Sequence, residues 1–593
     1  MANRSVLIGG RTVNVKGRSS FDKSFLNALT SGVGTITPVL KKLVIPSNGR
    51  VTMSAHAELP PLATDAYLRS HLKVEAFYTP ARLLTGSWQS WFSGEQVWSY
   101  QAENYARAEL PRGFVTRVYR NNDPDSPLVP DDGDLDFLFG ASSLSDYFNM
   151  RFEYDSSGHV VVPDYTGEEV ELTASSDSAE LRGCWVNLLP YVNYHLLYHH
   201  FYRNKSVQRP CFAPTDVATD SDPSVLHAYN LPFVVTLNKA DVILGSKMII
   251  DGSFPLTNSL RPSQPDYCDD VLLDDVCLAE LRQRNYGDDY FTAARPQAQA
   301  GNPVSVQVDA NGKFTIASLR IQNAFQEFEE INNYATPDYV QVNMARYGVS
   351  VANGVVQKPV VLGSADYPMF TKAVELNSQT ADASARNPFA SAGMLGSTAG
   401  RATANGIDFT FDFEAKEVGY LFVNVTLVPE ANYATGFDHD MRIFIENGDL
   451  TDLPCSLLEH VGDEPIMATE LAASASKSAV FGYVQRYLWH KAGSGNQIHG
   501  LYRKGQSLEA FVPQRNFTSA PQISSAFLEI PKTALDDIAS VSSGVSQYGL
   551  MLDCAFTIHI SEPLSESALP SLSDPAREHG REVYLSNGGS QFS

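Results

Sequence analysis

Apolar and polar residues alternate with a period of two at several widely separated places in the chain. The clearest run lies near its end, where Leu550, Leu552 and Cys554 begin a series of apolar even positions that continues to Ile560. Successive side chains of a strand point to opposite faces, so this run predicts a half-buried strand. FTFDF at 409–413 and the following GYLFVNVTLV at 419–428 predict two more strands.

Two further strands are predicted on either side of an early turn. TITPVLKKLVI at 35–45 and RVTMSAHAEL at 50–59 flank the segment PSNG. Its Asn48-Gly49 pair is a strong tight-turn signal between strands. Strands at both ends of a long chain, with bulky loops between them, indicate a mainly β fold. They favour a jelly roll, whose pairing joins distant segments.

Helices are expected to be few and short. In SLRIQNAFQEFEEINNYA at 318–335, apolar residues recur at the spacing of one helical stripe. A second helix is predicted from Pro190, because proline is favoured at a first helical position. Within it, His195 and His199 have the i, i+4 spacing of two metal ligands, but Leu196 stands where the zincin motif has glutamate. Packing is the preferred interpretation, and no metal site is predicted.

Stretches rich in Asp, Pro, Gly and Ser separate these elements, and we interpret them as insertions in one core. A basic N-terminal arm at 1–30, a single domain at 31–570 and a C-terminal tail at 571–593 are expected. The expected insertions are an acidic surface excursion at about 120–182 and further loops at 205–280 and 364–410.

Charge is strongly segregated along this chain, whose formal net charge is -23. Residues 1–50 carry eight bases and one acid, a balance of +7, whereas residues 121–180 carry fifteen acids and one base, a balance of -14. One surface is therefore suited to polyanions and another to water.

The N-terminal cations are the candidate nucleic-acid ligands, because flexible basic arms neutralise phosphates and release counterions. Phe21 and Phe25 lie among them and could stack on unpaired bases. The alternative is that these charges pair with acidic groups of neighbouring subunits. Arg503 and Lys504 are further candidates of the same kind. The N-terminal candidates are Arg4, Arg11, Lys16, Arg18 and Lys23.

A dense aromatic patch is formed by Trp88, Trp91 and Phe92, with Trp98 nearby in the sequence. Core packing explains such a patch as readily as an interface does. Aromatic residues are enriched where subunits bury their sides against one another, so we favour a role at subunit contacts.

Several classes of function have no support in the sequence. The six cysteines contain no Cys-x-x-Cys pair, so neither a disulfide framework nor a zinc site is predicted. No nucleophile elbow or Walker loop occurs, so no catalytic residue and no cofactor are predicted. No apolar run approaches the roughly 18 residues of a membrane span, and the apolar stretch at the amino terminus is too short for a signal sequence.

Beyond these patterns, a series of strings resembles the Microviridae major capsid proteins, in particular those of gokushoviruses. The first string surrounds Arg82, Leu83, Leu84 and Trp88. Further matches keep the family's order over most of the chain, which chance similarity would not do. They are LSDYF at 144–148, LLPYVNYHLLYHHFYRN at 188–204, LRQRNYGDDYFTAARPQAQAG at 281–301, SLRIQNAFQEFEEINNYA at 318–335, ARYGVSVANGVVQKPVVLG at 345–363, EVGYLFVNVTLVPEANYATG at 417–436 and FGYVQRYLWHK at 481–491.

The resemblance implies an eight-stranded jelly roll that assembles, through pentamers, into an icosahedral shell of about sixty copies around circular single-stranded DNA. Implied partners are minor spike or pilot proteins and a host-cell receptor. The protein would be a virion component assembled in the bacterial cytoplasm. One departure is the short bridge at 302–320, where gokushoviruses carry a long protruding excursion. An exposed loop elsewhere is therefore expected.

A different class of protein remains open from the residues alone. A soluble jelly-roll protein that binds or cleaves carbohydrate would use acidic and aromatic loops to line a sugar site. Such a protein should remain near 65.0 kDa in solution, whereas a capsid protein should form pentamers or particles.

Overall fold

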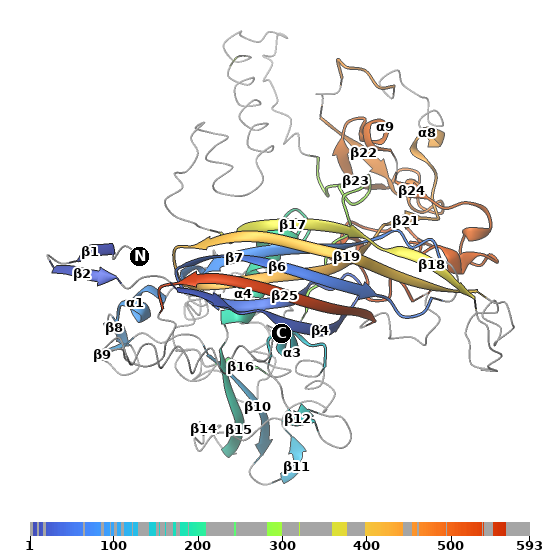
Figure 1. Ribbon diagram of the computed structural model, residues 1–593. Helices are drawn as coiled ribbons and strands as arrows, with labels where there is room; N and C mark the ends of the chain where they lie inside the picture. Colours follow the sequence, from blue (N-terminus) through green and yellow to red (C-terminus); the bar gives the residue numbers. More distant parts are fainter. Residues whose placement is uncertain are drawn as a thin grey trace, which may run out of the picture.

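Two antiparallel sheets face each other and enclose the main hydrophobic core in the computed structural model (Figure 1). The structure describes the chain in the ranges given next, and between some of them it describes only the backbone of short strands. Those ranges are 19–62, 66–84, 88–94, 141–149, 189–208, 281–298, 358–375, 398–442, 453–458, 462–493, 495–536 and 549–564, with positions 320 and 538.

The first sheet has six strands in the order β18-β19-β6-β25-β3, and β4 also pairs with β25. Along β25 the even positions are buried and most odd positions are exposed, which confirms the predicted alternation. In β19, Phe409, Phe411 and Phe413 are each 5% exposed, as their spacing predicted. The strands are β3 (Ser19–Asp22), β4 (Phe25–Ser31), β6 (Ser47–Glu58), β18 (Phe370–Glu375), β19 (Thr398–Ala415) and β25 (Leu550–Glu562).

The second sheet has four strands in the order β17-β7-β20-β5. Every residue of β20 is buried, because both faces of this strand are covered. Leu421 and Val423 belong to the core between the sheets, whereas Phe422 packs edge-on against Phe148 on the other side. The strands are β5 (Thr37–Val44), β7 (Ser70–Pro80), β17 (Val360–Pro368) and β20 (Gly419–Pro429).

Helical segments cover the outer side of this second sheet. They are α3 (Leu144–Tyr147), α4 (Leu189–Leu197) and the π-helical turn η2 (Tyr198–Tyr202), and α4 confirms the helix predicted near Pro190. The Tyr194 hydroxyl donates to the Ile36 carbonyl at 2.8 Å. The guanidinium of Arg284 donates two hydrogen bonds, of 2.6 and 3.0 Å, to the carboxylate of Glu75 in β7. They attach residues 281–298 to the sheet.

Short elements after β20 form a separate group beside one end of the sandwich (Figure 1). They are β21 (Asn432–Tyr433), α8 (His439–Arg442), β22 (Asp463–Met467), η5 (Ala468–Glu470), β23 (Val480–Gln485), α9 (Leu488–Ala492), β24 (Asn496–Gln497), η6 (Gly500–Tyr502), η7 (Glu509–Phe511) and α10 (Ser525–Leu528).

The remaining elements lie before β17 in the sequence. A small sheet has the order β11-β10-β15-β14, with β16 pairing β10. Of its strands, β11 and β14 lie within the expected acidic excursion and β16 lies within the loop at 205–280, whereas β10 precedes the excursion and β15 extends past it. These elements are β1 (Arg4–Ile8), β2 (Arg11–Val15), η1 (Ala81–Leu83), α1 (Trp88–Ser93), β8 (Gln96–Ser99), β9 (Asn104–Arg107), β10 (Arg112–Arg120), β11 (Asp123–Pro127), β12 (Glu153–Tyr154), β13 (Val160–Val161), β14 (Val170–Thr173), β15 (Ser178–Asn187) and β16 (Val242–Leu244).

The prediction of a turn at Asn48-Gly49 is wrong. Both residues lie inside β6, where Gly49 is paired with Phe413 on one side and Ile560 on the other. A Cβ atom on Gly49 would lie 2.5 Å from the His559 carbonyl oxygen. The glycine therefore permits a close approach of strands. The connection between β5 and β6 is shorter than expected and lies at residues 45–46.

Two expected segments also differ from the structure. Residues 19–31 contain β3 and β4, which pair with β25, so this part of the expected N-terminal arm belongs to the six-stranded sheet. The loop expected at 364–410 contains parts of β17 and β19 and all of β18, because its described residues pair with neighbouring strands. The helix expected at 318–335, except position 320, and the tail at 571–593 lie outside the described residues.

Candidate functional site

The N-terminal cations fall in different structural settings. Arg4 and Arg11 lie in the paired strands β1 and β2, opposite Val15 and Ile8 respectively. Lys16 and Arg18 lie outside the described residues.

Lys23 occupies a defined place in the six-stranded sheet. Its ammonium nitrogen lies 2.6 Å from the carboxylate of Glu562, whose side chain is 4% exposed. Lys23 therefore compensates a buried carboxylate at the end of β25. The role predicted for it at nucleic acid stays a prediction, and its charge already has a partner within the chain.

The aromatic patch predicted at residues 88–92 is brought together on the short helix α1. The ring centroids of Trp88 and Trp91 are 5.3 Å apart, and the Trp88 ring stacks on Phe92 at 6.1 Å. Phe92 is 66% exposed, so one side of the patch faces solvent. Helix α1 lies at the end of the sandwich where β7 finishes (Figure 1). An exposed aromatic side chain in this place is suited to a contact with another protein surface.

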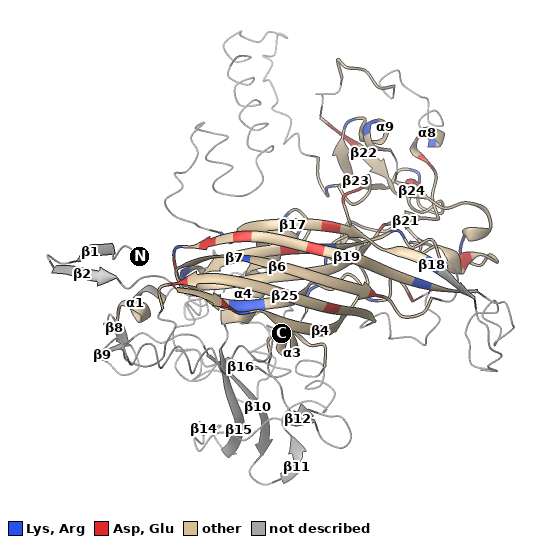
Figure 2. Ribbon diagram, viewed as in Figure 1, with Lys and Arg blue, Asp and Glu red and all other residues tan. Residues whose placement is uncertain are grey.

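The outer face of the six-stranded sheet carries cross-strand polar pairs. Arg50 of β6 is bonded to Asp412 of β19 at 2.7 and 3.0 Å, and Arg401 is bonded to Glu58 at 2.5 Å. Figure 2 shows acidic and basic positions interspersed along the strands. Because both arginines already have carboxylate partners, this face offers phosphate groups little uncompensated positive charge.

A cleft of about 860 Å³ follows the edge strand β4. Its walls come from β4, β5, the segment 141–149 that contains α3, and the ends of β6 and β25. Lys41 donates to the Phe148 carbonyl at 2.7 Å, and burial lowers the pKa of this lysine. Leu26, which is 80% exposed, also lines the cleft. The cleft is thus a mixed apolar and polar surface rather than a row of carboxylates.

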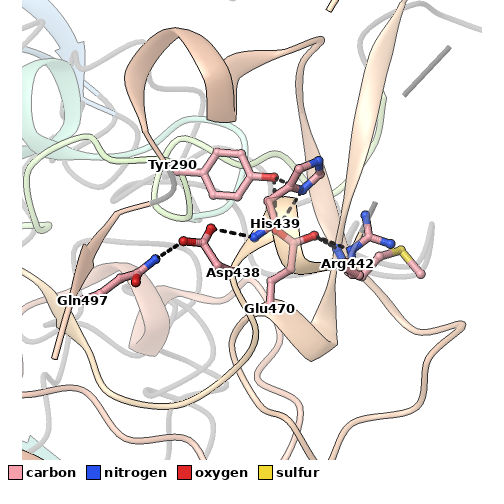
Figure 3. Close-up of polar contacts among 7 residues, drawn as sticks. Tyr290, Asp438, His439, Arg442, Glu470 and Gln497 are labelled. Atoms are coloured by element: carbon pink, nitrogen blue, oxygen red, sulfur yellow. Dashed lines mark hydrogen bonds and ion pairs between the residues drawn. The ribbon is translucent and has the colours of Figure 1, made fainter. Parts of the chain in front are cut away.

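A buried carboxylate, Glu470 of η5, joins three separate segments of the chain (Figure 3). It accepts a hydrogen bond from the Tyr290 hydroxyl at 3.2 Å and one from Arg442 of α8 at 3.1 Å. The Met467 backbone N–H adds a third at 3.1 Å. The Nδ1 atom of His439 lies 3.2 Å from the same carboxylate.

The surroundings of Glu470 indicate a structural role. Its side chain is 1% exposed and that of His439 is 6% exposed, and the His439 ring stacks on Trp489 at 4.7 Å. Burial, with the nearby Glu470 charge second, raises the pKa of Tyr290, which therefore stays protonated and donates. A carboxylate, a histidine and a tyrosine could serve acid–base chemistry, but here they are closed off from dissolved substrate. The cluster holds the group of short elements onto residues 281–298.

The two histidines singled out on the predicted helix each contact an arginine. Nδ1 of His195 accepts from Arg282 at 3.3 Å, and Nε2 of His199 lies 3.4 Å from a guanidinium nitrogen of Arg203. Burial lowers the pKa of His199 to about 3. Within the described ranges, no group of three or more His, Cys, Asp or Glu side chains could hold a metal ion. No helix in those ranges is long and apolar enough to cross a membrane.

Sequence reasoning missed the Glu470 cluster. Tyr290, His439 and Glu470 come from three distant segments, and none lies in a recognisable spacing pattern. A single acidic residue near hydrophobic neighbours is too common a feature to have marked the site. The cluster is visible only once the chain is folded.

Comparison with known proteins finds a family model that matches most of the chain. The model of a family described as "Capsid protein (F protein)" matches residues 158–572. The capsid protein VP1 of Chlamydia phage 1 is 20% identical over 633 aligned positions, covering 94% of this chain and 96% of that protein. The capsid protein VP1 of Spiroplasma virus 4 is 20% identical over 373 positions, covering 60% of this chain and 66% of that protein.

Proposed function

The chain belongs to the capsid protein (F protein) family, and from this premise we propose that it builds the shell of a tailless Microviridae phage. The proposed shell is icosahedral, contains about sixty copies and forms through pentamers. It would enclose circular single-stranded DNA and contact minor spike or pilot proteins and a host receptor. Assembly in the bacterial cytoplasm would precede release of the virion.

We propose that the wall of this shell is an eight-stranded jelly roll. Two sets of four strands support the assignment: β17, β7, β20 and β5 in one sheet, and β18, β19, β6 and β25 in the other. The short strands β3 and β4 would extend the second set along β25. Eight-stranded jelly rolls form viral capsid domains, and the insertions between the strands would reach neighbouring copies.

One observation carries the capsid proposal: the similarity to Chlamydia phage 1 VP1 runs over 94% of this chain and 96% of that protein. An alignment of this extent includes both sheets and their insertions, and not a shared domain alone. Large exposed apolar side chains add support, because shell subunits bury such groups between copies. Among them are Phe92 at 66%, Met441 at 71% and Leu457 at 83% exposure.

The decisive experiment is to express the full-length protein and to examine it by sizing chromatography and negative-stain electron microscopy. We expect pentamers or closed particles. A protein that stays near 65.0 kDa at high concentration would contradict the capsid proposal and favour the carbohydrate-binding alternative.

A variant tests the proposed role of the N-terminal cations in the same particles. Arg4, Arg11, Lys16 and Arg18 are changed together to glutamine, which removes four positive charges that could neutralise phosphates. We expect less nuclease-protected DNA per particle, with pentamer formation unchanged. Wild-type DNA content in the variant particles would show that these residues do not contact the genome. Lys23 is left intact because it pairs with Glu562.

A further inference from the structure

Three aromatic rings meet beside two exposed cations at one end of the sandwich. The ring of Tyr67, just before β7, lies 6.1 Å from that of Tyr502 and 6.3 Å from that of Phe511. Tyr67 is 57% exposed, whereas the other two rings are half-buried and support it. Arg503 and Lys504 follow Tyr502 directly and are exposed. We call these five residues the aromatic–basic patch.

Hydrogen bonds hold the backbone of this patch in place. The Tyr67 N–H donates to the Phe511 carbonyl at 2.7 Å. Gln514 bridges the turn, because its side chain donates to the Tyr502 carbonyl at 3.0 Å and accepts from the Lys504 N–H at 3.1 Å. The patch is therefore preorganised, which reduces the entropy that binding would cost.

The two cations have no carboxylate partner among the described residues. Arg503 Nε donates to the Ile498 carbonyl at 3.3 Å, and neither residue forms an ion pair within the described ranges. The nearby Glu509 carboxylate instead accepts the Gly505 N–H at 2.7 Å. By contrast, Arg50 and Arg401 on the outer face of the six-stranded sheet are both paired with acids. The patch thus combines exposed aromatic surface with uncompensated positive charge.

We propose that the aromatic–basic patch binds unpaired nucleotides, with a base stacked on Tyr67 and phosphates neutralised by Arg503 and Lys504. Single-stranded nucleic acid is bound in this way without sequence preference. The rings of this patch would also suit a protein contact, because Tyr, Phe and Arg are enriched in protein–protein interfaces. Two adjacent exposed cations without an acidic partner among the described residues favour a polyanion instead. The inference rests on the proposed packaging of single-stranded DNA and locates a contact for it outside the N-terminal region.

The patch and the N-terminal strands lie toward opposite ends of the sandwich. Tyr67 comes just before Ser70, the first residue of β7. The N-terminal strands lead into β3, which pairs with the Glu562 end of β25. That end of β25 lies at the end of the sandwich opposite Ser70. Eleven residues of β7 span about 35 Å. One subunit would therefore contact the single-stranded DNA at two separated places.

The test measures binding of a fluorescent oligothymidylate to the unassembled full-length protein by anisotropy at several salt concentrations. Tyr67→Leu should weaken binding roughly 5- to 150-fold, the effect of losing one stacked base, while Tyr67→Phe should retain it. Arg503→Ala with Lys504→Ala should reduce the slope of log K against log salt by about 1.4, the value for two phosphate contacts.

The matched control removes two exposed lysines elsewhere, Lys372→Ala with Lys477→Ala, and should leave the slope near its wild-type value. Unchanged binding in the patch variants, or equal losses in the control, would overturn the proposal. Loss of particle formation with oligonucleotide affinity intact would also overturn it, and would assign the patch to a protein contact. If the wild-type protein binds DNA through the patch but forms no particles, the capsid proposal fails and the patch stands.

Discussion

At the scale of single residues, two arginine–carboxylate pairs in this protein have opposite environments. Arg442 bonds to Glu470, whose side chain is 1% exposed, whereas Arg50 bonds to Asp412, whose side chain is 67% exposed. Water screens the pair of Arg50 and Asp412. The carboxylate of Glu470 is shielded from water, so its attraction to Arg442 is stronger. Removing a carboxylate therefore has different consequences at the two places.

We expect Glu470→Ala to lower the free energy of unfolding by about 3–5 kcal/mol, because it removes the buried carboxylate that accepts from Arg442 and from the Met467 N–H and leaves the guanidinium uncompensated. Asp412→Ala is the matched control and should have little effect, since its arginine is rehydrated. Equilibrium unfolding in urea measures both. A similar midpoint for the two variants would show that the Glu470 cluster does not stabilise the fold.

At the scale of elements, β6 lies between β19 and β25 and needs a residue without a side chain at Gly49. The neighbouring backbone is too close for a Cβ atom, which would lie 2.5 Å from the His559 carbonyl oxygen. Three strands drawn from residues 47–58, 398–415 and 550–562 thus depend on one position.

Gly49→Ala should therefore destabilise the protein by about 1–3 kcal/mol, because β25 must shift to accept the methyl group. Gly287→Ala is the control, since nothing lies within 4 Å of a Cβ atom there. Thermal unfolding followed by circular dichroism compares the two variants. An equal shift in both would argue against steric crowding at Gly49.

At the scale of the whole molecule, apolar side chains remain exposed at several places on the isolated chain. Phe92 on α1 and Phe370 on β18 are both 66% exposed, and they lie toward opposite ends of the sandwich (Figure 1). Shell assembly would bury such groups between copies, while the folding of one chain does not require them to be buried.

We expect Phe92→Ser to abolish or strongly reduce particle formation without changing the unfolding midpoint, because the aromatic patch on α1 is proposed to lie at a subunit contact. Phe92→Tyr keeps the aromatic ring at the contact and is the control that should assemble. Analytical ultracentrifugation gives the assembled fraction. Normal assembly of the Phe92→Ser variant would remove α1 from the list of subunit contacts.

How much of this architecture was predictable follows from particular residues. The alternation from Leu550 to Ile560 correctly predicted β25, and Phe409, Phe411 and Phe413 correctly predicted the core face of β19. These patterns are local, because the geometry of the backbone alone sends successive side chains to opposite faces. Ordered family strings also led to the correct family.

Other features depended on contacts between distant segments. Asn48-Gly49 looks like a turn in the sequence. The glycine instead allows the close approach of strand β25, which lies about five hundred positions later in the chain. Glu470 acquires its partners only when α8 and residues 281–298 meet it, and Tyr67 meets Tyr502 in the same way. The sequence by itself determined which faces of the strands are apolar. Only the tertiary structure decided which strands approach closely and which polar groups meet, because pairing and burial depend on residues that the local chain does not contain.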